Sequence, residues 1–243
     1  MMKVLQASYS IYALLLFILL MLVFGLFIII PLIISPKGAK ISFVFFRLWA
    51  GLWFFLCGVR YEVEGLEHIK KESSYIFIFN HRSFVDAPII PVSVPKEVNA
   101  IGKKELSKIP IFGLIVDRVA VWVDRSSPQS RKESLRKVKE VIASGVSVMI
   151  APEGTRNGTG ETLLPFKKGA FRLSAETQTP ILPMAIIGAD KILPKGGKIM
   201  KPGKIRVIFS KEMSPPSSSD EDTILSYTEK GRNRLEAMLL THE

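Results

Sequence analysis

The chain has 243 residues, which is enough for one large domain or for one medium domain with an appendage. Its formal net charge is +11, yet residues 1–59 contain no Asp or Glu, so an acid-free apolar block precedes a basic body. This distribution favours an anionic membrane surface as neighbour, and the lack of zinc-finger, RNA-recognition and basic-zipper patterns argues against nucleic acid. One cysteine excludes an intrachain disulfide and a cysteine-rich metal site, and three scattered histidines argue against a histidine-based metal site, which leaves an oxygen-ligated ion open.

The first 59 residues predict two membrane-associated helices. Residues 11–34 form a run of 24 residues without a charge, long enough for ~36 Å of helix against a hydrocarbon core of ~30 Å. Pro31 and the polar segment 35–38 end this helix. A second apolar run, 41–59, is rich in aromatic residues typical of the membrane interface. It contains Arg47, whose guanidinium we expect to reach the headgroups.

Three arrangements of this N-terminal block are considered. The apolar run is too long for a cleaved signal peptide, and no small-residue cleavage site follows it. Helices that span the bilayer and a hairpin that enters one leaflet both stay open. The connection 35–40 carries two lysines, which are awkward to move across a bilayer, so we favour the hairpin. We therefore predict a membrane-anchoring hairpin over 1–59 and an α/β domain over 60–243, on the cytoplasmic face of the inner cell membrane.

In residues 60–243, short apolar strands alternate with helical stretches. We expect strands at 75–80, 98–101, 120–123, 146–151, 181–187 and 205–209, and helices at about 87–92, 107–116, 129–144, 168–178 and 220–241. Strands rich in Ile, Val and Phe with little polar alternation are typically buried on both faces. The pattern predicts an α/β fold with a mixed, largely parallel sheet flanked by helices. Two prolines in 179–185 predict that part of that segment is an edge or a bend.

The segment 80–86, NHRSFVD, directly follows a predicted buried strand. Residues five apart in a continuous helix point ~140° away from each other, so His81 and Asp86 could not meet there. Pro88 is tolerated only in a first helical turn, which places His81 in the turn between strand and helix. There the carboxylate can fix the imidazole tautomer and leave the other ring nitrogen free to accept a proton. The alternative is a structural histidine beside an aspartate that caps a helix.

Two further motifs place cations and a tight turn near strand ends. Lys103 and Arg125 lie at the two ends of a predicted helix, where both can meet a phosphate. The segment 151–156, APEGTR, follows a predicted strand at its carboxyl end, where α/β proteins build their sites. Gly154 allows close backbone approach, and Arg156 offers a fork for phosphate. A solvated basic surface and an ordinary turn are the alternatives.

Four segments together resemble the glycerolipid acyltransferase family, most closely its 1-acyl-sn-glycerol-3-phosphate acyltransferases. NHRSFVD, GKKEL…IP…VDR, APEGTR and TPILPMAI match its four blocks in order and spacing across about residues 75–190. Two positions depart from the family pattern. Ala151 stands where the third block often has Phe, and Ala120 where the second often has Gly. These departures affect local packing and substrate preference, because neither removes a reactive group.

The resemblance implies that His81 is the general base and that Asp86 orients it. It implies that the acceptor is bound by Lys103, Arg125, Glu153, Gly154, Thr155 and Arg156, and that the fourth block borders the acyl donor. The implied reaction moves a fatty acyl group from acyl carrier protein or coenzyme A to the sn-2 hydroxyl of lysophosphatidic acid, giving phosphatidic acid. Membrane lipids are the implied surroundings, and no cofactor or metal is expected.

Other functions stay open. The sequence has no Gly-x-Ser-x-Gly elbow and its only cysteine lies in the apolar block, consistent with direct transfer that needs no covalent acyl-enzyme. The acceptor could instead be glycerol-3-phosphate or another lysophospholipid. A lipid hydrolase would use the His81–Asp86 pair to activate water, and would release free fatty acid without an acceptor. A non-catalytic membrane protein would bind anionic lipid through its basic face and would not depend on the pair.

Overall fold

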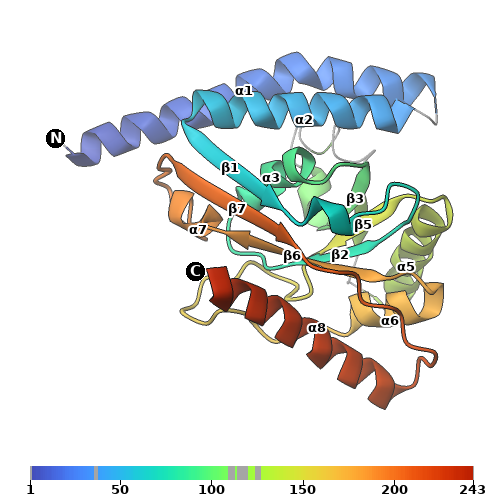
Figure 1. Ribbon diagram of the computed structural model, residues 1–243. Helices are drawn as coiled ribbons and strands as arrows, with labels where there is room; N and C mark the ends of the chain where they lie inside the picture. The colour runs from blue at the N-terminus through green and yellow to red at the C-terminus, as the bar shows by residue number, and fades with distance from the viewer. Residues whose placement is uncertain (1, 36–37, 109–112, 114–119, 124–126, 243) are drawn as a thin grey trace.

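The computed structural model describes residues 2–35, 38–108, 113, 120–123 and 127–242 (Figure 1). Its centre is a seven-stranded sheet of order β1-β7-β6-β2-β5-β3-β4. The strands are β1 Val59–Glu64, β2 Ile76–Phe79, β3 Val98–Lys103, β4 Ala120–Val123, β5 Ser147–Ile150, β6 Ile181–Ile187 and β7 Gly203–Phe209. Every described pair is parallel except β6 with β7. The predicted mixed, largely parallel sheet is confirmed.

Helices cover both faces of the sheet, as Figure 1 shows. The helices of the body are α3 Asp86–Ser93, α5 Pro128–Ala143, α6 Gly169–Thr177, α7 Ala189–Ile192 and α8 Glu221–His242, with short 3-10 turns at Leu66–His68 and Lys104–Lys108. Successive residues of β2 point to opposite faces. Ile76 and Ile78 pack in a core with α5, α6 and α8, whereas Phe77 and Phe79 pack in a core with α3 and the N-terminal helices. The strand is therefore buried on both faces, as its composition predicts. The helix predicted at 107–116 lies mostly outside the described residues.

The two N-terminal helices, α1 Met2–Ile34 and α2 Gly38–Leu56, form an antiparallel hairpin that lies across the body (Figure 1). Ser42 Oγ donates to the Ile28 carbonyl and Trp53 Nε1 donates to the Ala13 carbonyl, which fixes the two helices against each other. Both helices are long and apolar enough to cross a membrane, by length and composition. Their buried residues share one core with α3 and the sheet, so one side of the hairpin is protein interior.

Arg47 corrects one expectation about the hairpin. Its Nε and Nη2 donate to the carbonyls of Pro91 and Val94, at 3.0 and 2.6 Å, and its guanidinium lies over the Phe43 ring. Carbonyls at the C-terminus of a helix lack intrahelical partners and attract cations. The prediction that Arg47 reaches the headgroups is wrong, because this side chain joins α2 to the end of α3.

Two strands differ from the sequence prediction. β1 pairs in parallel with β7 at the edge of the sheet, although we predicted no strand before residue 75. The segment around Pro183, predicted as an edge or a bend, is instead β6, which lies between β7 and β2. The Pro183 carbonyl accepts from the Ser210 N–H at 3.0 Å. An N–H at position 183 would point to the same side as this carbonyl, toward the residue just beyond the end of β7. Its absence therefore removes no hydrogen bond between β6 and β2.

Candidate active site

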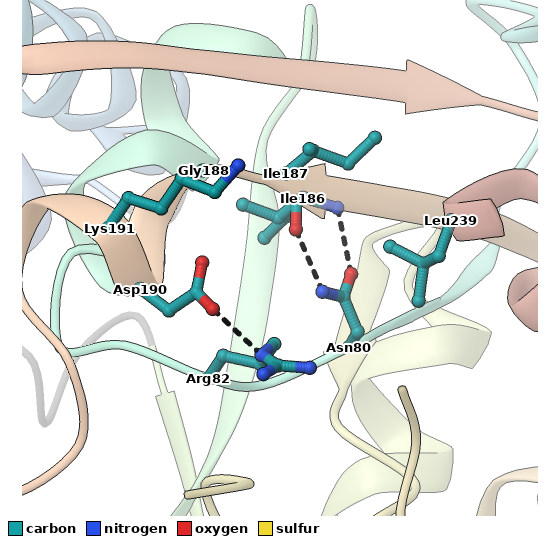
Figure 2. Close-up of a pocket in the computed structure, with 8 residues that line it drawn as sticks. All are labelled: Asn80, Arg82, Ile186, Ile187, Gly188, Asp190, Lys191 and Leu239. Atoms are coloured by element: carbon teal, nitrogen blue, oxygen red, sulfur yellow. Dashed lines mark hydrogen bonds and ion pairs between the residues drawn. The ribbon is translucent and has the colours of Figure 1, made fainter. Parts of the chain in front are cut away.

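The site begins where β2 ends. Asn80 continues the ladder to β6 with its side chain. Its amide nitrogen donates to the Ile186 carbonyl at 2.8 Å, and its amide oxygen accepts from the Ile186 N–H at 2.7 Å (Figure 2). Asn80 is 1% exposed, so both bonds are shielded from water. This pairing fixes the backbone that leads directly into His81.

Asp86 closes the turn that follows. Its Oδ2 atom accepts three hydrogen bonds of 2.8 Å, from His81 Nδ1 and from the backbone N–H groups of Arg82 and Ser83. Asp86 is also the first residue of α3, where the helix dipole favours a carboxylate. The pairing assigns the ring proton to Nδ1, so Nε2 of a neutral imidazole is the basic nitrogen. Among the described residues, Nε2 has no hydrogen-bond partner.

Glu153 holds the backbone of the same turn from the third motif. Its Oε1 accepts from the His81 N–H and its Oε2 accepts from the Leu164 N–H, both at 2.9 Å. Glu153 is 3% exposed, and burial raises the pKa of its carboxyl while the two backbone donors oppose that rise. The Asn157 N–H donates to the His81 carbonyl at 2.5 Å. Both backbone groups of His81 are therefore bound to the segment 153–157.

His81 and Asp86 also line an apolar cavity of about 230 Å³ between the body and the hairpin. The hairpin contributes aromatic and thioether side chains to its wall, namely Phe17, Met21, Phe43, Phe46 and Trp49. Strands β3 and β4 contribute Val98, Ala100, Ile101, Gly102, Ala120 and Trp122. The ring of His81 packs edge-on against Phe79, with 28% of its side chain exposed. The imidazole is thus accessible at the wall of an apolar space, not enclosed in the interior.

The other predicted site residues fall into two groups. Gly154, Thr155 and Arg156 continue directly from Glu153, and Gly154 has a φ of 71°, a value that favours glycine. Arg156 precedes Asn157, the residue that binds the His81 carbonyl, and makes no ion pair with any described residue. The side chain of Lys103 and the whole of Arg125 lie outside the described residues. No group of residues suited to a metal ion occurs in the described ranges.

Sequence reasoning assigned no role to three residues that hold the turn: Asn80, Arg82 and Asn157. The only signal was for Asn80, a polar residue at the end of an otherwise apolar strand. Arg82 and Asn157 act through partners at Asp190 and His81, far away in the sequence. A local pattern cannot show such contacts.

The body of the chain matches a known protein family. A family model described as Acyltransferase matches residues 60–187, which contain β2, the His81–Asp86 turn and the 153–157 segment. The chain belongs to the acyltransferase family.

Several curated relatives share one name. A 1-acyl-sn-glycerol-3-phosphate acyltransferase of Cocos nucifera is 37% identical over 171 residues, which are 69% of this chain and 54% of the relative. The 1-acyl-sn-glycerol-3-phosphate acyltransferase alpha of Mus musculus is 30% identical over 169 residues, 68% of this chain and 58% of the relative. A chloroplastic relative from Brassica napus is 33% identical, and the match spans 48% of its length. The chain spans about half the length of the first curated relatives it matches.

A solved structure resembles the whole chain. The 1-acyl-sn-glycerophosphate (LPA) acyltransferase PlsC from Thermotoga maritima superposes with a TM-score of 0.84 and 26% sequence identity. The match covers 100% of this chain and 99% of that one, so it includes the N-terminal hairpin as well as the α/β body.

Proposed function

We propose that this protein transfers a fatty acyl group from an acyl thioester to the sn-2 hydroxyl of lysophosphatidic acid, giving phosphatidic acid. The observation that carries the proposal is the His81 ring. Its Nδ1 is held by Asp86, its Nε2 is without a described partner, and it lines an apolar cavity. The names of the relatives and of the solved neighbour support this acceptor.

The proposed chemistry is general base catalysis. Nε2 of His81 takes the proton of the acceptor hydroxyl as that oxygen attacks the thioester carbonyl. The carbon–sulfur bond then breaks, and the imidazolium returns its proton to the leaving thiolate. Asp86 stabilises the imidazolium through Nδ1. Base assistance of this kind typically contributes ~10²–10⁴-fold to the rate.

The apolar cavity is the proposed site of the acyl chain. Its wall is mostly aromatic and aliphatic, its two titratable residues are His81 and Asp86, and one side is formed by the hairpin. An acyl chain placed there exchanges water for hydrocarbon contacts and brings its carbonyl carbon to the imidazole.

The cationic residues are proposed to bind the acceptor phosphate. Arg156 lies one residue from the backbone contact with His81 and makes no ion pair with a described residue, so its fork is available for a phosphate. Thr155, Gly154, Lys103 and Arg125 complete the proposed set. Glu153 differs from them, because both of its oxygens already accept backbone N–H groups. We assign Glu153 to holding the turn.

The membrane setting and the donor belong to the same proposal. Many apolar side chains of α1 face outward while its other side shares a core with the body, which supports insertion of the hairpin into one leaflet. A lysophospholipid acceptor and its product both prefer the bilayer. We place the body on the cytoplasmic face of the inner cell membrane, with acyl carrier protein or coenzyme A as carrier of the acyl thioester and no cofactor.

The decisive experiment replaces the proposed base. His81→Ala should lower acyl transfer to lysophosphatidic acid by about 10²–10⁴-fold, because the hydroxyl then has no base, with the unfolding temperature little changed. Mass spectrometry of the products from lysophosphatidic acid, monoacylglycerol and glycerol-3-phosphate identifies the acceptor. His68→Ala is the matched control, since His68 lies in the 3-10 turn Leu66–His68.

Full activity in a folded His81→Ala preparation would overturn the proposed role. Release of free fatty acid without any acceptor would point to a hydrolase. Equal turnover with monoacylglycerol would remove the argument for a phosphate contact.

A further inference from the structure

Arg82 follows the proposed base but points to the opposite side of the chain. Phe79 and His81 line the apolar cavity, whereas Asn80 and Arg82 line a separate polar cavity of about 190 Å³. Figure 2 shows the polar cavity with Asp190, Lys191 and the end of α8 around it. Because neighbouring residues of an extended chain alternate in direction, the Arg82 side chain is kept away from the substrate.

The Arg82 guanidinium bridges two other segments. Its Nε forms an ion pair with Asp190 Oδ2 at 3.0 Å, and its Nη1 donates to the carbonyls of Glu161 and Thr162 at 3.1 and 3.4 Å. The two charged side chains are 21% and 31% exposed, so water screens this pair less than a pair on the open surface. The ion pair joins the catalytic turn to the connection between β6 and β7.

Ser83 adds a second link to that β6–β7 connection (residues 188–202). Its Oγ donates to the Leu193 carbonyl at 2.6 Å, and a bridge pairs Ser83 with Pro194. Two consecutive residues after His81 are therefore attached to the same connection. Ser83 is fully buried, which protects this contact from competing water.

The β6–β7 connection is itself held in place. It starts at Gly188, whose φ is 87° and where an added Cβ would lie 2.5 Å from the Lys204 carbonyl oxygen. It reaches the hairpin at Met200, whose N–H donates to Ser10 Oγ of α1 at 2.9 Å. Met200 is also buried in the core that contains the hairpin. The connection that carries Asp190 is therefore held in place near both of its ends.

We propose that Arg82 is a positioning residue for the acyl transfer, and that its ion pair with Asp190 keeps the His81–Asp86 turn in the geometry needed for proton transfer. This inference rests on the proposed function. Within the turn, every described bond to Asp86 converges on the single atom Oδ2. The 153–157 segment holds the backbone of His81 from outside, and the contacts of Arg82 and Ser83 attach the next two residues of the turn to the β6–β7 connection. Small misplacements of a catalytic group reduce rates strongly.

Kinetics of the full-length protein in detergent test the proposal. Arg82→Gln and Asp190→Asn should each lower kcat by roughly tenfold, with the KM values for lysophosphatidic acid and acyl thioester within about twofold of the wild type. Arg82→Lys, which keeps the charge, should recover part of kcat. The double exchange of Arg82→Asp with Asp190→Arg should also recover part of the kcat that either single change loses. Arg136→Gln, which removes two exposed ion pairs on α5, is the control and should leave kcat unchanged.

A second readout does not depend on acyl transfer. In ¹⁵N-histidine spectra of the wild type, His81 should show a protected proton on Nδ1, assigned by its loss in His81→Ala. Arg82→Gln should weaken or broaden that signal while the signals of His68 and His242 stay the same. This result would stand even if the substrate proved to be different, so it separates failure of this inference from failure of the proposed function.

Three results would overturn the proposal. One is an unchanged kcat in Arg82→Gln. Another is a KM for lysophosphatidic acid that rises alone, which would make Arg82 a substrate-binding residue. The third is an unaltered Nδ1 signal accompanied by a drop in unfolding temperature that accounts for the lost activity.

Discussion

Two buried carboxylates hold the site together, and they differ in how their oxygens accept hydrogen bonds. Asp86 uses one oxygen for three donors, and its Oδ1 is buried without a described hydrogen-bond partner. Glu153 uses each oxygen once, for a backbone N–H from a different segment. Asp86 thus orients the ring of His81, whereas Glu153 orients its backbone.

Glu153 gives a pH prediction. Burial raises its pKa above the ordinary value of 4.5, so the folded state binds this proton more tightly than the unfolded chain does. The site therefore contributes stability at low pH that is lost as the pH rises through the raised pKa. The unfolding free energy of the wild type minus that of Glu153→Gln should fall as the pH rises from 4.5, as measured by denaturant titration in detergent.

Glu161→Gln, an exposed change on the same loop, should show no such trend. If the wild-type value minus the Glu153→Gln value instead rose with pH, the two backbone donors would outweigh burial and lower the pKa of Glu153.

Sequence reasoning found the His81–Asp86 pair because all of its determinants are local. A strand end, five residues of spacing and a proline two positions after Asp86 define the turn. It did not find the role of Glu153, because the partner N–H is 72 residues away. Nor did it find Arg82, because the motif contains no sign of Asp190.

Among the elements, α2 and α3 depend on each other through Arg47. The guanidinium satisfies two carbonyls at the C-terminus of α3, the helix that carries Asp86 at its other end. Hydrogen bonds from charged groups contribute more than neutral ones, and carbonyls left without a partner in a buried place are costly.

Arg47→Met should therefore lower the unfolding free energy by about 1.5–3 kcal/mol, measured by denaturant titration in detergent. Arg60→Met is the matched control, because Arg60 is exposed on the edge strand β1 and should change stability little. An equal effect of the two substitutions would show that the contacts with α3 carry no special weight.

The missed strand and the misjudged strand have different causes. β1, with the sequence VRYEVE, alternates apolar and polar residues, a period-two signal typical of an edge strand, and it could have been predicted. The central position of β6 could not, because it depends on where β7 ends relative to Pro183. Ser134 and Leu135 show the same limit in α5. Ser134 is buried with Val138 and Ile142, whereas the apolar Leu135 of the same helix is 37% exposed.

At the scale of the whole molecule, the two sides of the hairpin differ in their surroundings. One side of α1 and α2 shares a core with the body and lines the apolar cavity, while much of the rest exposes large apolar side chains. An apolar surface of this extent is typical of a membrane-binding element. The apolar cavity is thus lined by the same element that carries this exposed apolar surface.

Polar changes on the outer side should weaken membrane binding without unfolding the protein. Leu15→Gln with Leu22→Gln, at positions 61% and 48% exposed, removes two large apolar groups from that surface. Each buried leucine is worth about 1.5–3 kcal/mol, so co-sedimentation with phosphatidylethanolamine–phosphatidylglycerol vesicles should fall at least about tenfold. Leu225→Gln with Leu240→Gln on α8 is the control and should bind as the wild type does. An equal loss of vesicle binding in the two double variants would show that the outer side of α1 has no particular role in membrane attachment.

The sequence by itself determined the order of most elements, the apolar anchor and the His81–Asp86 turn, because periodicity, proline placement and short spacing act within a few residues. Only the tertiary structure decided that Glu153 binds the His81 backbone, that Arg82 pairs with Asp190, and that Arg47 ends α3 instead of meeting lipid. Those contacts join segments separated by 44 to 108 positions. They exist because the sheet order and the packed hairpin bring such segments together, which no local pattern encodes.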